Sequence, residues 1–372
     1  MTVGILKESS NENRVSLLPE QIETLTKKNI LVLIEEDAGI LAFASNESYL
    51  LKGAKIVSRE DILQQANILI FIHPTELKGV KKNVIILGVY QPLSNLDIVN
   101  ACCNQTVTCF SLDMIPRTTR AQSMDVLSSQ ANIAGYKAVL LAANLLPHYF
   151  PMFMTAAGSV APAKILILGA GVAGLQAIAT AKRLGAVIEV FDTRPAVKEE
   201  VMSLGANFIE VEGAQDASKA GGYAVEQSEE YKNKQQQRIA EAVVKADVVI
   251  TTAQIPGKKA PILITDEMIS KMKNGSVIID LASATGGNTL QTKNNQTIVT
   301  NNGISIVGNS NLQSSMPFAA SKLYGKNVLN FLQLIITKEG EINLNFDDDL
   351  VKGTCITHDG KIVNERVASL IS

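Results

Sequence analysis

The stretch that decides the fold is Lys164-Ile-Leu-Ile-Leu-Gly169-Ala-Gly171-Val-Ala-Gly174-Leu. It reads as a buried strand, a glycine-rich turn and the start of an alanine-rich helix. A second apolar strand, Val187–Phe191, follows and is closed by Asp192. This order of strand, turn, helix, strand and acid is typical of the first βαβ unit of a dinucleotide-binding fold. We therefore expect a dinucleotide site at these residues.

The three glycines have different roles in such a unit. Gly169 allows the tight turn, Gly171 lets the backbone approach a pyrophosphate, and Gly174 lets the helix pack closely on the strand. The helix N-terminus presents unpaired N–H groups and a partial positive charge to the phosphates. The alternative is a glycine turn that serves close packing alone and binds no ligand.

Asp192 bears on which dinucleotide is bound. A carboxylate at the end of the second strand accepts hydrogen bonds from a ribose 2′-OH and repels a 2′-phosphate. Arg194 lies two residues further on and by itself would favour a phosphate, but the carboxylate argues against that choice. We interpret Arg194 as a surface or adenine-side residue and predict NAD(H) as the cofactor.

Composition narrows the class of protein. The chain has 372 residues, of which 46% are hydrophobic and 19% charged, as in a soluble α/β protein with two domains. The net charge of −2 gives no sign of a nucleic-acid partner or of a polybasic membrane anchor. The four cysteines form no CxxC pair and the three histidines are widely separated. We expect reduced thiols and no metal site.

Short apolar segments alternate with helical patterns along the chain. Such alternation predicts parallel sheets with helices on both faces. Helices are expected at Pro19–Lys27, after Ser58, over Gln122–Leu146 and over Ala319–Ile336, the last returning to the first domain. The expected strands are Val3–Leu6, Ile30–Glu35, Lys55–Val57, Ile68–Ile72, Val84–Val89 and Val107–Leu112, and later Asn207–Val211, Val248–Thr252, Ser276–Asp280, Thr297–Val299 and Ile304–Val307.

The resulting fold class is α/β. We expect two Rossmann-like doubly wound parallel-sheet domains with a cleft between them, residues 1–125 with 311–372 and residues 126–310. The stretch Pro147–Ala163 is interpreted as a loop that leads into the strand at Lys164. Glu212–Gln237 is polar and shows neither helix nor strand period until its end. It is either a surface insertion or a lid with Tyr223 at its tip.

One run of residues resembles a known family. Residues 116–128 read Pro116-Arg117-Thr-Thr-Arg120-Ala-Gln122-Ser-Met-Asp125-Val-Leu-Ser128. They closely resemble the signature of the NAD(H)-binding alpha subunit of proton-translocating NAD(P) transhydrogenase, in the alanine dehydrogenase/transhydrogenase superfamily. The resemblance covers essentially the whole chain, and this run is far more specific than the glycines. Further matches are Gly4–Pro19, Gly169–Gln176, Asp192–Pro195, Gly221–Ala224, Thr251–Gly257, Asp280–Ala282 and Gly286–Asn288.

The resemblance implies two sets of site residues. In that family a loop carrying Arg, Gln and Asp holds the nicotinamide ring, which by match are Arg117, Gln122 and Asp125, with Ser128 following. Hydride passes directly between two nicotinamides, so the protein supplies orientation and water exclusion rather than a nucleophile or base. The alternative for this loop is a helix-capping salt bridge. The matched cofactor-binding residues are Gly169, Gly171, Val172, Ala173, Gly174, Asp192, Thr193, Arg194, Gly222, Tyr223, Thr252, Ala253 and Asp280.

The resemblance also implies partners. The family member is a homodimer that docks on membrane-embedded subunits, on the cytoplasmic face of the inner membrane. A beta subunit there holds NADP(H), and Re/Si-specific hydride transfer is coupled to proton translocation. No nucleic-acid partner is implied. This chain resembles the version whose soluble alpha portion is a separate polypeptide.

Two other functions stay open. An alanine dehydrogenase would use a substrate-binding arginine, which Arg14 fits, and a histidine after the fifth strand, where this chain has Tyr90-Gln91. His73 ends another strand and is interpreted as structural. A non-catalytic NAD(H) sensor would lack the nicotinamide loop, which is present here. One departure from the transhydrogenase pattern, Gln313-Ser314-Ser315 in place of Pro-Ser-Arg, is assigned no role.

Overall fold

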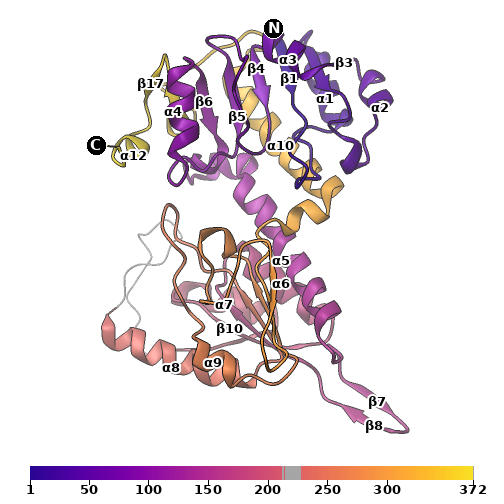
Figure 1. Ribbon diagram of the computed structural model, residues 1–372, viewed down its shortest axis with the longest axis vertical. Coiled ribbons are helices and arrows are strands. Elements are labelled where there is room, and N and C mark those ends of the chain that lie inside the picture. The colour runs from indigo at the N-terminus through magenta and orange to yellow at the C-terminus, as the bar shows by residue number, and fades with distance from the viewer. Residues whose placement is uncertain (212, 214–227, 372) are drawn as a thin grey trace. The chain divides into compact units, whose positions relative to one another are not determined.

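The computed structural model describes residues 1–211, 213 and 228–371. The chain forms two compact units, each with its own sheet (Figure 1). Unit 1 contains Met1–Gln130 and Ser314–Ser372, and unit 2 contains Ala131–Gln313. These boundaries lie a few residues beyond those expected from the sequence. Within the described residues, no helix is both long and apolar enough to cross a membrane.

Unit 1 is built on an eight-stranded sheet in the order β17-β16-β6-β5-β4-β1-β2-β3. The six strands β1 to β6 pair in parallel, with β1 and β4 at the centre, where the direction of winding reverses. The expected doubly wound fold is confirmed. The strands are β1 (Thr2–Ile5), β2 (Leu31–Glu35), β3 (Lys55–Val57), β4 (Ile68–Ile70), β5 (Ile85–Gly88), β6 (Thr108–Ser111), β16 (Cys355–His358) and β17 (Lys361–Ile362).

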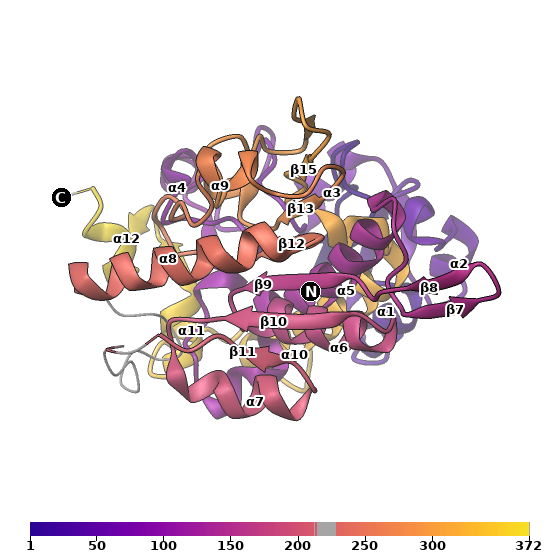
Figure 2. The same ribbon diagram turned by 90° about the horizontal axis from the view of Figure 1, so that it is seen from below.

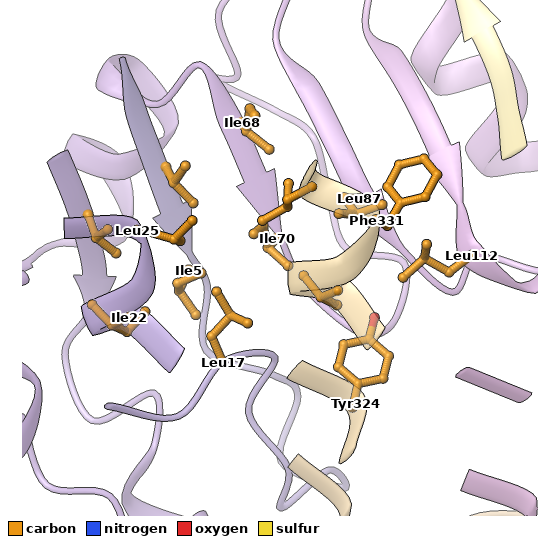
Figure 3. Close-up of a cluster of buried hydrophobic side chains, with 14 of the residues drawn as sticks. Ile5, Leu17, Ile22, Leu25, Ile68, Ile70, Leu87, Leu112, Tyr324 and Phe331 are labelled. Carbon is orange, nitrogen blue, oxygen red and sulfur yellow. The ribbon is translucent and has the colours of Figure 1, made fainter. Parts of the chain in front are cut away.

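Helices cover both faces of this sheet. On one face α1 and the long α10 bury a cluster that includes Ile22, Tyr324 and Phe331 (Figure 3). On the other face α3 and α4 bury a cluster that includes Ile62 and Ile98. The predicted return of the chain to the first domain is thus confirmed by α10. The helices are α1 (Pro19–Thr26), α2 (Asn46–Leu50), α3 (Arg59–Gln65), α4 (Leu96–Asn104), α10 (Pro317–Ile335), α11 (Asp349–Thr354) and α12 (Glu365–Ala368).

Unit 2 is built on a seven-stranded sheet in the order β11-β10-β9-β12-β13-β15-β14. All neighbours pair in parallel except β14 with β15. The winding reverses between β9 and β12, which lie side by side in Figure 2. This is the strand order of dinucleotide-binding domains. The strands are β9 (Lys164–Leu168), β10 (Val187–Phe191), β11 (Asn207–Phe208), β12 (Val248–Thr251), β13 (Val277–Asp280), β14 (Thr297–Val299) and β15 (Ser305–Val307).

The helices of unit 2 also lie on both faces of its sheet, where two separate apolar cores are buried. One core contains Ala138 of α5 and Ile178 of α6, and the other contains Ile239 of α8 and Met268 of α9. The helices are α5 (Val126–Leu145, which begins in unit 1), α6 (Val172–Arg183), α7 (Lys198–Ser203), α8 (Glu229–Lys245) and α9 (Asp266–Ser270).

One expectation was wrong. Pro147–Ala163 is not a plain loop, because β7 (Phe153–Thr155) and β8 (Gly158–Val160) form a hairpin that extends from unit 2 (Figure 1). The end of Glu212–Gln237, from Glu229 onward, is helical, in α8. The two sheets are mostly parallel, as expected, and β16, β17 and β14 run antiparallel at their edges. Gly222 and Tyr223, and with them the proposed lid, lie outside the described residues.

Candidate functional site

The glycine-rich turn lies at the point where the winding of the unit 2 sheet reverses. Gly169 follows β9 with a φ of +106°, a conformation that favours glycine. A Cβ at Gly169 would overlap the hydroxyl of Thr252, which follows β12. Thr252 binds the turn, because its N–H donates to the Leu168 carbonyl oxygen at 2.9 Å and its Oγ1 to the Gly169 carbonyl oxygen at 3.1 Å. Ligands of open α/β sheets bind at such reversal points.

The other two glycines of the turn have opposite surroundings. A Cβ at Gly174 would overlap the Gly169 carbonyl oxygen, so Gly174 permits the close approach of α6 to the turn. A Cβ at Gly171 would meet no atom of the described residues within 4 Å, so the backbone there borders space that these residues leave open. Gly171 is the N-cap of α6, whose first turn contains N–H groups without helical partners. The turn therefore offers an open anion-binding helix N-terminus.

Sequence reasoning missed a third contact that builds this turn. Gly135 of α5 packs on the first turn of α6, and a Cβ there would overlap the carbonyl oxygen of Ala173. Gly135 lies ten residues after Asp125, and no local pattern in the sequence indicates its contact with α6. Val172, in the same turn of α6, is 41% exposed.

Asp192 ends β10 and is buried beside the turn. Its Oδ2 accepts a hydrogen bond from the Ala170 N–H at 2.7 Å. The Arg194 side chain folds back onto it, with Nε 2.9 Å from Oδ1 and Nη2 2.8 Å from Oδ2. This ion pair raises the pKa of the Arg194 guanidinium. The Arg194 side chain is thus not a freely exposed surface group, because its charge is paired with Asp192.

Asp280 ends β13 and is fully buried. Its carboxylate accepts hydrogen bonds from the N–H groups of Ala282 at 2.9 Å and Asn288 at 2.6 Å, and from the Thr292 hydroxyl at 2.7 Å. The Asn288 amide in turn donates to the carbonyl oxygen of Ala253 at 2.9 Å. In this structure Asp280 therefore fixes the loop that contains Asn288, and Asn288 in turn binds Ala253, the residue after Thr252.

The nicotinamide loop expected from the resemblance lies in unit 1, as the 3-10 helix η3 (Thr119–Met124) and its flanks. Ala121 and Met124 are buried in the core, whereas Arg117 and Gln122 are exposed. The carbonyl oxygen of Ser123, the residue after Gln122, accepts hydrogen bonds from the side-chain amides of two asparagines of α10, Asn327 at 2.8 Å and Asn330 at 2.9 Å. The loop thus presents polar side chains from an anchored backbone.

Two carboxylates hold the ends of this loop. Asp125 caps α5, because Ser128 donates its N–H to Oδ1 at 2.9 Å and its hydroxyl to Oδ2 at 2.6 Å. Arg120 forms a two-point ion pair with Asp348, with nitrogen–oxygen distances of 2.7 and 2.6 Å, and also contacts Asp349. Arg120 was included in the quoted motif without an assigned role. Asp125 and Ser128 therefore form a helix cap in this structure, whereas the Gln122 side chain is exposed.

Two family models cover nearly the whole chain. Residues 138–365 match the model described as alanine dehydrogenase/PNT, C-terminal domain, and residues 4–134 match alanine dehydrogenase/PNT, N-terminal domain. The chain belongs to the alanine dehydrogenase/PNT family. The break between the two matches falls within α5, where the two units meet along the sequence.

Relatives within this family are similar over their full length. The first part of NAD(P) transhydrogenase subunit alpha from Rickettsia prowazekii is 44% identical over 373 residues, covering 98% of this chain and 96% of the relative. The protein of the same name from Rhodospirillum rubrum is 43% identical over 377 residues, covering 98% of each. The crystal structure of transhydrogenase from Sinorhizobium meliloti has a TM-score of 0.89 and 40% identity, covering 98% of this chain and 100% of that one.

A buried ion pair lies in unit 1 at Arg14, the residue that an alanine dehydrogenase would use to bind its substrate. Arg14 is buried and donates to both carboxylate oxygens of Glu12, from Nε at 2.8 Å and from Nη2 at 2.5 Å. It also donates to Gln130 Oε1 at 2.8 Å, and His73 Nε2 lies 2.8 Å from Glu12 Oε2. Burial alone would raise the pKa of Glu12, but hydrogen bonds from Arg14 and His73 hold it below its usual range. Arg14 is thus engaged in a structural ion pair.

Proposed function

We propose that this chain is the NAD(H)-binding alpha subunit of an NAD(P) transhydrogenase. The observation that carries the proposal is the open helix N-terminus at Gly171, beside the buried carboxylate of Asp192, in a chain 43 to 44% identical to subunits of that name. The first feature suits a pyrophosphate and the second suits an adenosine ribose. Both stand at the reversal point of a dinucleotide-type sheet.

The residues of unit 2 fit this cofactor. Gly169 and Gly174 leave no room for a Cβ, so the turn is built around close backbone contacts, while Gly171 is left open toward a ligand. We propose that Val172 and Ala173 offer their N–H groups to the phosphates. Thr193, Thr252 and Ala253 would border the nucleotide, with Asp280 acting through the loop that it organises. Gly222 and Tyr223 complete the proposed set.

In the proposed reaction, the residues of the unit 1 loop orient the nicotinamide. Bound NADH supplies the hydride, which passes directly to NADP⁺ on the partner subunit. Arg117 and Gln122 would position the ring, and Asp125 with Ser128 would hold the loop at the start of α5. Such a transfer needs geometry and exclusion of water rather than an acid or base. The buried Ala121 and Met124 favour a loop of fixed shape.

The proposed assembly follows the resemblance and the names of the relatives. The chain would act as a homodimer on the cytoplasmic face of the inner membrane. It would dock there on membrane-embedded subunits, including the NADP(H)-binding beta subunit, and Re/Si-specific transfer would be coupled to proton translocation. The net charge of −2 gives no sign of a nucleic-acid partner.

Cyclic transhydrogenation tests the proposal. The purified chain is mixed with an NADP(H)-binding transhydrogenase domain, and reduction of an acetylpyridine analogue of NAD⁺ by NADH is followed in the presence of NADP(H). Turnover that requires both proteins is expected. Alanine plus NAD⁺ is the parallel assay. Formation of NADH from alanine, with no cyclic turnover, would instead identify an amino-acid dehydrogenase, and tight NADH binding without either reaction would identify a sensor.

A further inference from the structure

Four hydrogen-bond donors of the protein surround the Asp192 carboxylate. Two are backbone groups, the N–H of Ala170 at 2.7 Å and the N–H of Arg194 at 2.9 Å. Two belong to the guanidinium of Arg194, Nε at 2.9 Å and Nη2 at 2.8 Å. A carboxylate accepts about four hydrogen bonds. These four donors therefore use the full capacity of the group on which a ribose would depend.

We propose that Arg194 determines the cofactor specificity of this site by competing with the ribose for Asp192. The inference rests on the proposed NAD(H) site. The two guanidinium donors occupy the acceptor positions of Asp192 that two ribose hydroxyls need. Nucleotide binding therefore replaces two hydrogen bonds from Arg194 with two hydrogen bonds from the ribose. The displaced guanidinium remains beside the 2′-position, where its charge weakens the repulsion of a 2′-phosphate by Asp192. Arg194 thus lowers the affinity of the site for NAD(H). It also reduces the ratio by which the site prefers NAD(H) to NADP(H).

The backbone and side-chain donors differ in whether they can move away from Asp192. Ala170 lies between two glycines of the turn, and its N–H is fixed by the backbone. The Arg194 side chain is 21% exposed, against 6% for that of Asp192. It is followed by Pro195, the first residue of the short 3-10 helix η4 (Pro195–Val197). Rotation of one side chain therefore frees half of the acceptor positions of Asp192 while the rest of the turn stays in place.

Charges near Arg194 give the direction of the effect on specificity. Among the described residues, hydrogen bonding to Asp192 and the negative charges of Asp192 and of Glu200 in α7 raise the pKa of Arg194, and the charge of Asp192 also raises the pKa of Tyr231 of α8, where burial is the larger cause. With Arg194 present, its guanidinium lies directly on the Asp192 carboxylate and offsets that negative charge. Without it, a 2′-phosphate would meet the Asp192 carboxylate without this counter-charge. Removal of the guanidinium should therefore disfavour NADPH more than NADH.

Nucleotide titrations of Arg194→Gln test the inference. Dissociation constants for NADH and NADPH are measured from nucleotide fluorescence, which is undisturbed by tryptophan because the chain has none. The ratio of the NADPH constant to the NADH constant should rise roughly tenfold, and NADH should bind at least as tightly as to the unmodified chain. Arg183→Gln removes an equal charge from the exposed end of α6 and should change neither value.

Arg194→Lys separates competition from charge. Lysine keeps the positive charge but not the two-point geometry, so NADH should bind at least as tightly while the ratio stays close to that of the unmodified chain. If Arg194→Gln does not fold, this NADH result decides the matter. Weaker NADH binding in both variants, or an unchanged or lower ratio in Arg194→Gln, would overturn the inference. Failure of the unmodified chain to bind NADH would instead refute the proposed function.

Discussion

At the scale of single residues, Gly171 and Gly174 of the same turn are glycines for different reasons. Gly174 is required by packing, because the backbone of the turn occupies the space of its missing side chain. No packing contact within the described part of the chain requires Gly171, since the same space is open there and its φ of −77° suits any residue. A glycine without a structural reason in a helix N-cap indicates a ligand that approaches the backbone.

Alanine substitutions at these two glycines should therefore have opposite effects. Gly174→Ala should lower the free energy of unfolding by about 1 to 3 kcal/mol, because the added methyl group overpacks the turn. Gly171→Ala should fold with unchanged stability but lose NADH affinity, because the methyl group fills the ligand's space. Denaturant unfolding and NADH titration measure the two quantities. Normal NADH affinity in Gly171→Ala would argue against a phosphate site at this helix.

At the scale of elements, the η3 loop is held from both sides. Hydrogen bonds from α10 reach its backbone, and the ion pair between Arg120 and Asp348 joins it to α11. Its exposed residues therefore lie on a backbone of defined position.

The carboxyl ends of β1 and β4 are also joined, because Glu8 accepts hydrogen bonds from the N–H groups of Ile72 at 2.5 Å and His73 at 3.2 Å.

Gln122→Asn tests the role of the η3 loop in transfer. Shortening the side chain by one methylene on a fixed backbone should slow hydride transfer on the order of tenfold or more, while NADH binding changes little. Cyclic transhydrogenation measures the rate and fluorescence titration measures binding. Gln64→Asn, an exposed substitution on α3, is the control. Equal losses of rate and affinity would make Gln122 a binding residue only.

Glu8 predicts a pH dependence of stability in unit 1. Burial raises its pKa to about 7, against the lowering effects of the Ile72 and His73 backbone and of the His73 charge. Between pH 4.5 and about 7 the unfolded chain releases this proton while the folded chain keeps it. The contribution of Glu8 to stability is therefore full below pH 4.5, falls by roughly 3 kcal/mol as the pH rises to about 7, and levels off above that pH.

Glu8→Gln removes this titrating group. The free energy of unfolding is measured by urea unfolding for the variant and for the unmodified chain. The value for the variant minus the value for the unmodified chain should rise from pH 5 to pH 8. Glu12 and His73 are present in the same cluster in both proteins, so the difference between the two proteins reports on Glu8. Glu20→Gln, an exposed change on α1, should give a constant difference. A constant difference for Glu8→Gln would show that Glu8 is ionised throughout.

At the scale of the whole molecule, the proposed residues come from both units. The glycine turn and Asp192 belong to unit 2, and Arg117, Gln122 and Asp125 belong to unit 1. The proposed function assigns a role to each set. The units themselves repeat one plan, since each sheet reverses its winding between the first strand and the fourth. Unit 1 fills its reversal point with Glu8 and its neighbours, and unit 2 leaves its own open at Gly171.

Hydrogen exchange with NADH present tests this division of the site. Added NADH should slow exchange at residues 169–174 in unit 2 and also at residues 117–128 in unit 1, because bound ligand stabilises the segments that it contacts. Exchange measured by mass spectrometry on peptides from both units provides the comparison. Protection confined to unit 2 would show that the η3 loop does not engage the cofactor on this chain alone.

Local pattern was sufficient for much of the fold. The strands and helices around Gly169 follow from apolar runs, glycine stops and the terminal acid, and their observed bounds differ from the expected ones by a few residues. Ser58 caps α3 as the sequence predicts, accepting a hydrogen bond from the Asp61 N–H at 3.2 Å. The η3 motif was found by resemblance, because its residues follow no period. Such signals are available because each depends on residues close together in the chain.

The tertiary structure decided what depends on distant partners. By itself the sequence determined two doubly wound sheets, a glycine turn and an acid at the end of β10, since backbone geometry and apolar periodicity are local properties. It did not determine that Arg120 pairs with Asp348, that Asp280 is enclosed by its own loop, or that β16 extends the edge of β6. Nor did it place the Arg194 guanidinium on Asp192, although only two residues separate them. These contacts are selected by burial and by competition among possible partners, which exist only once the chain has folded.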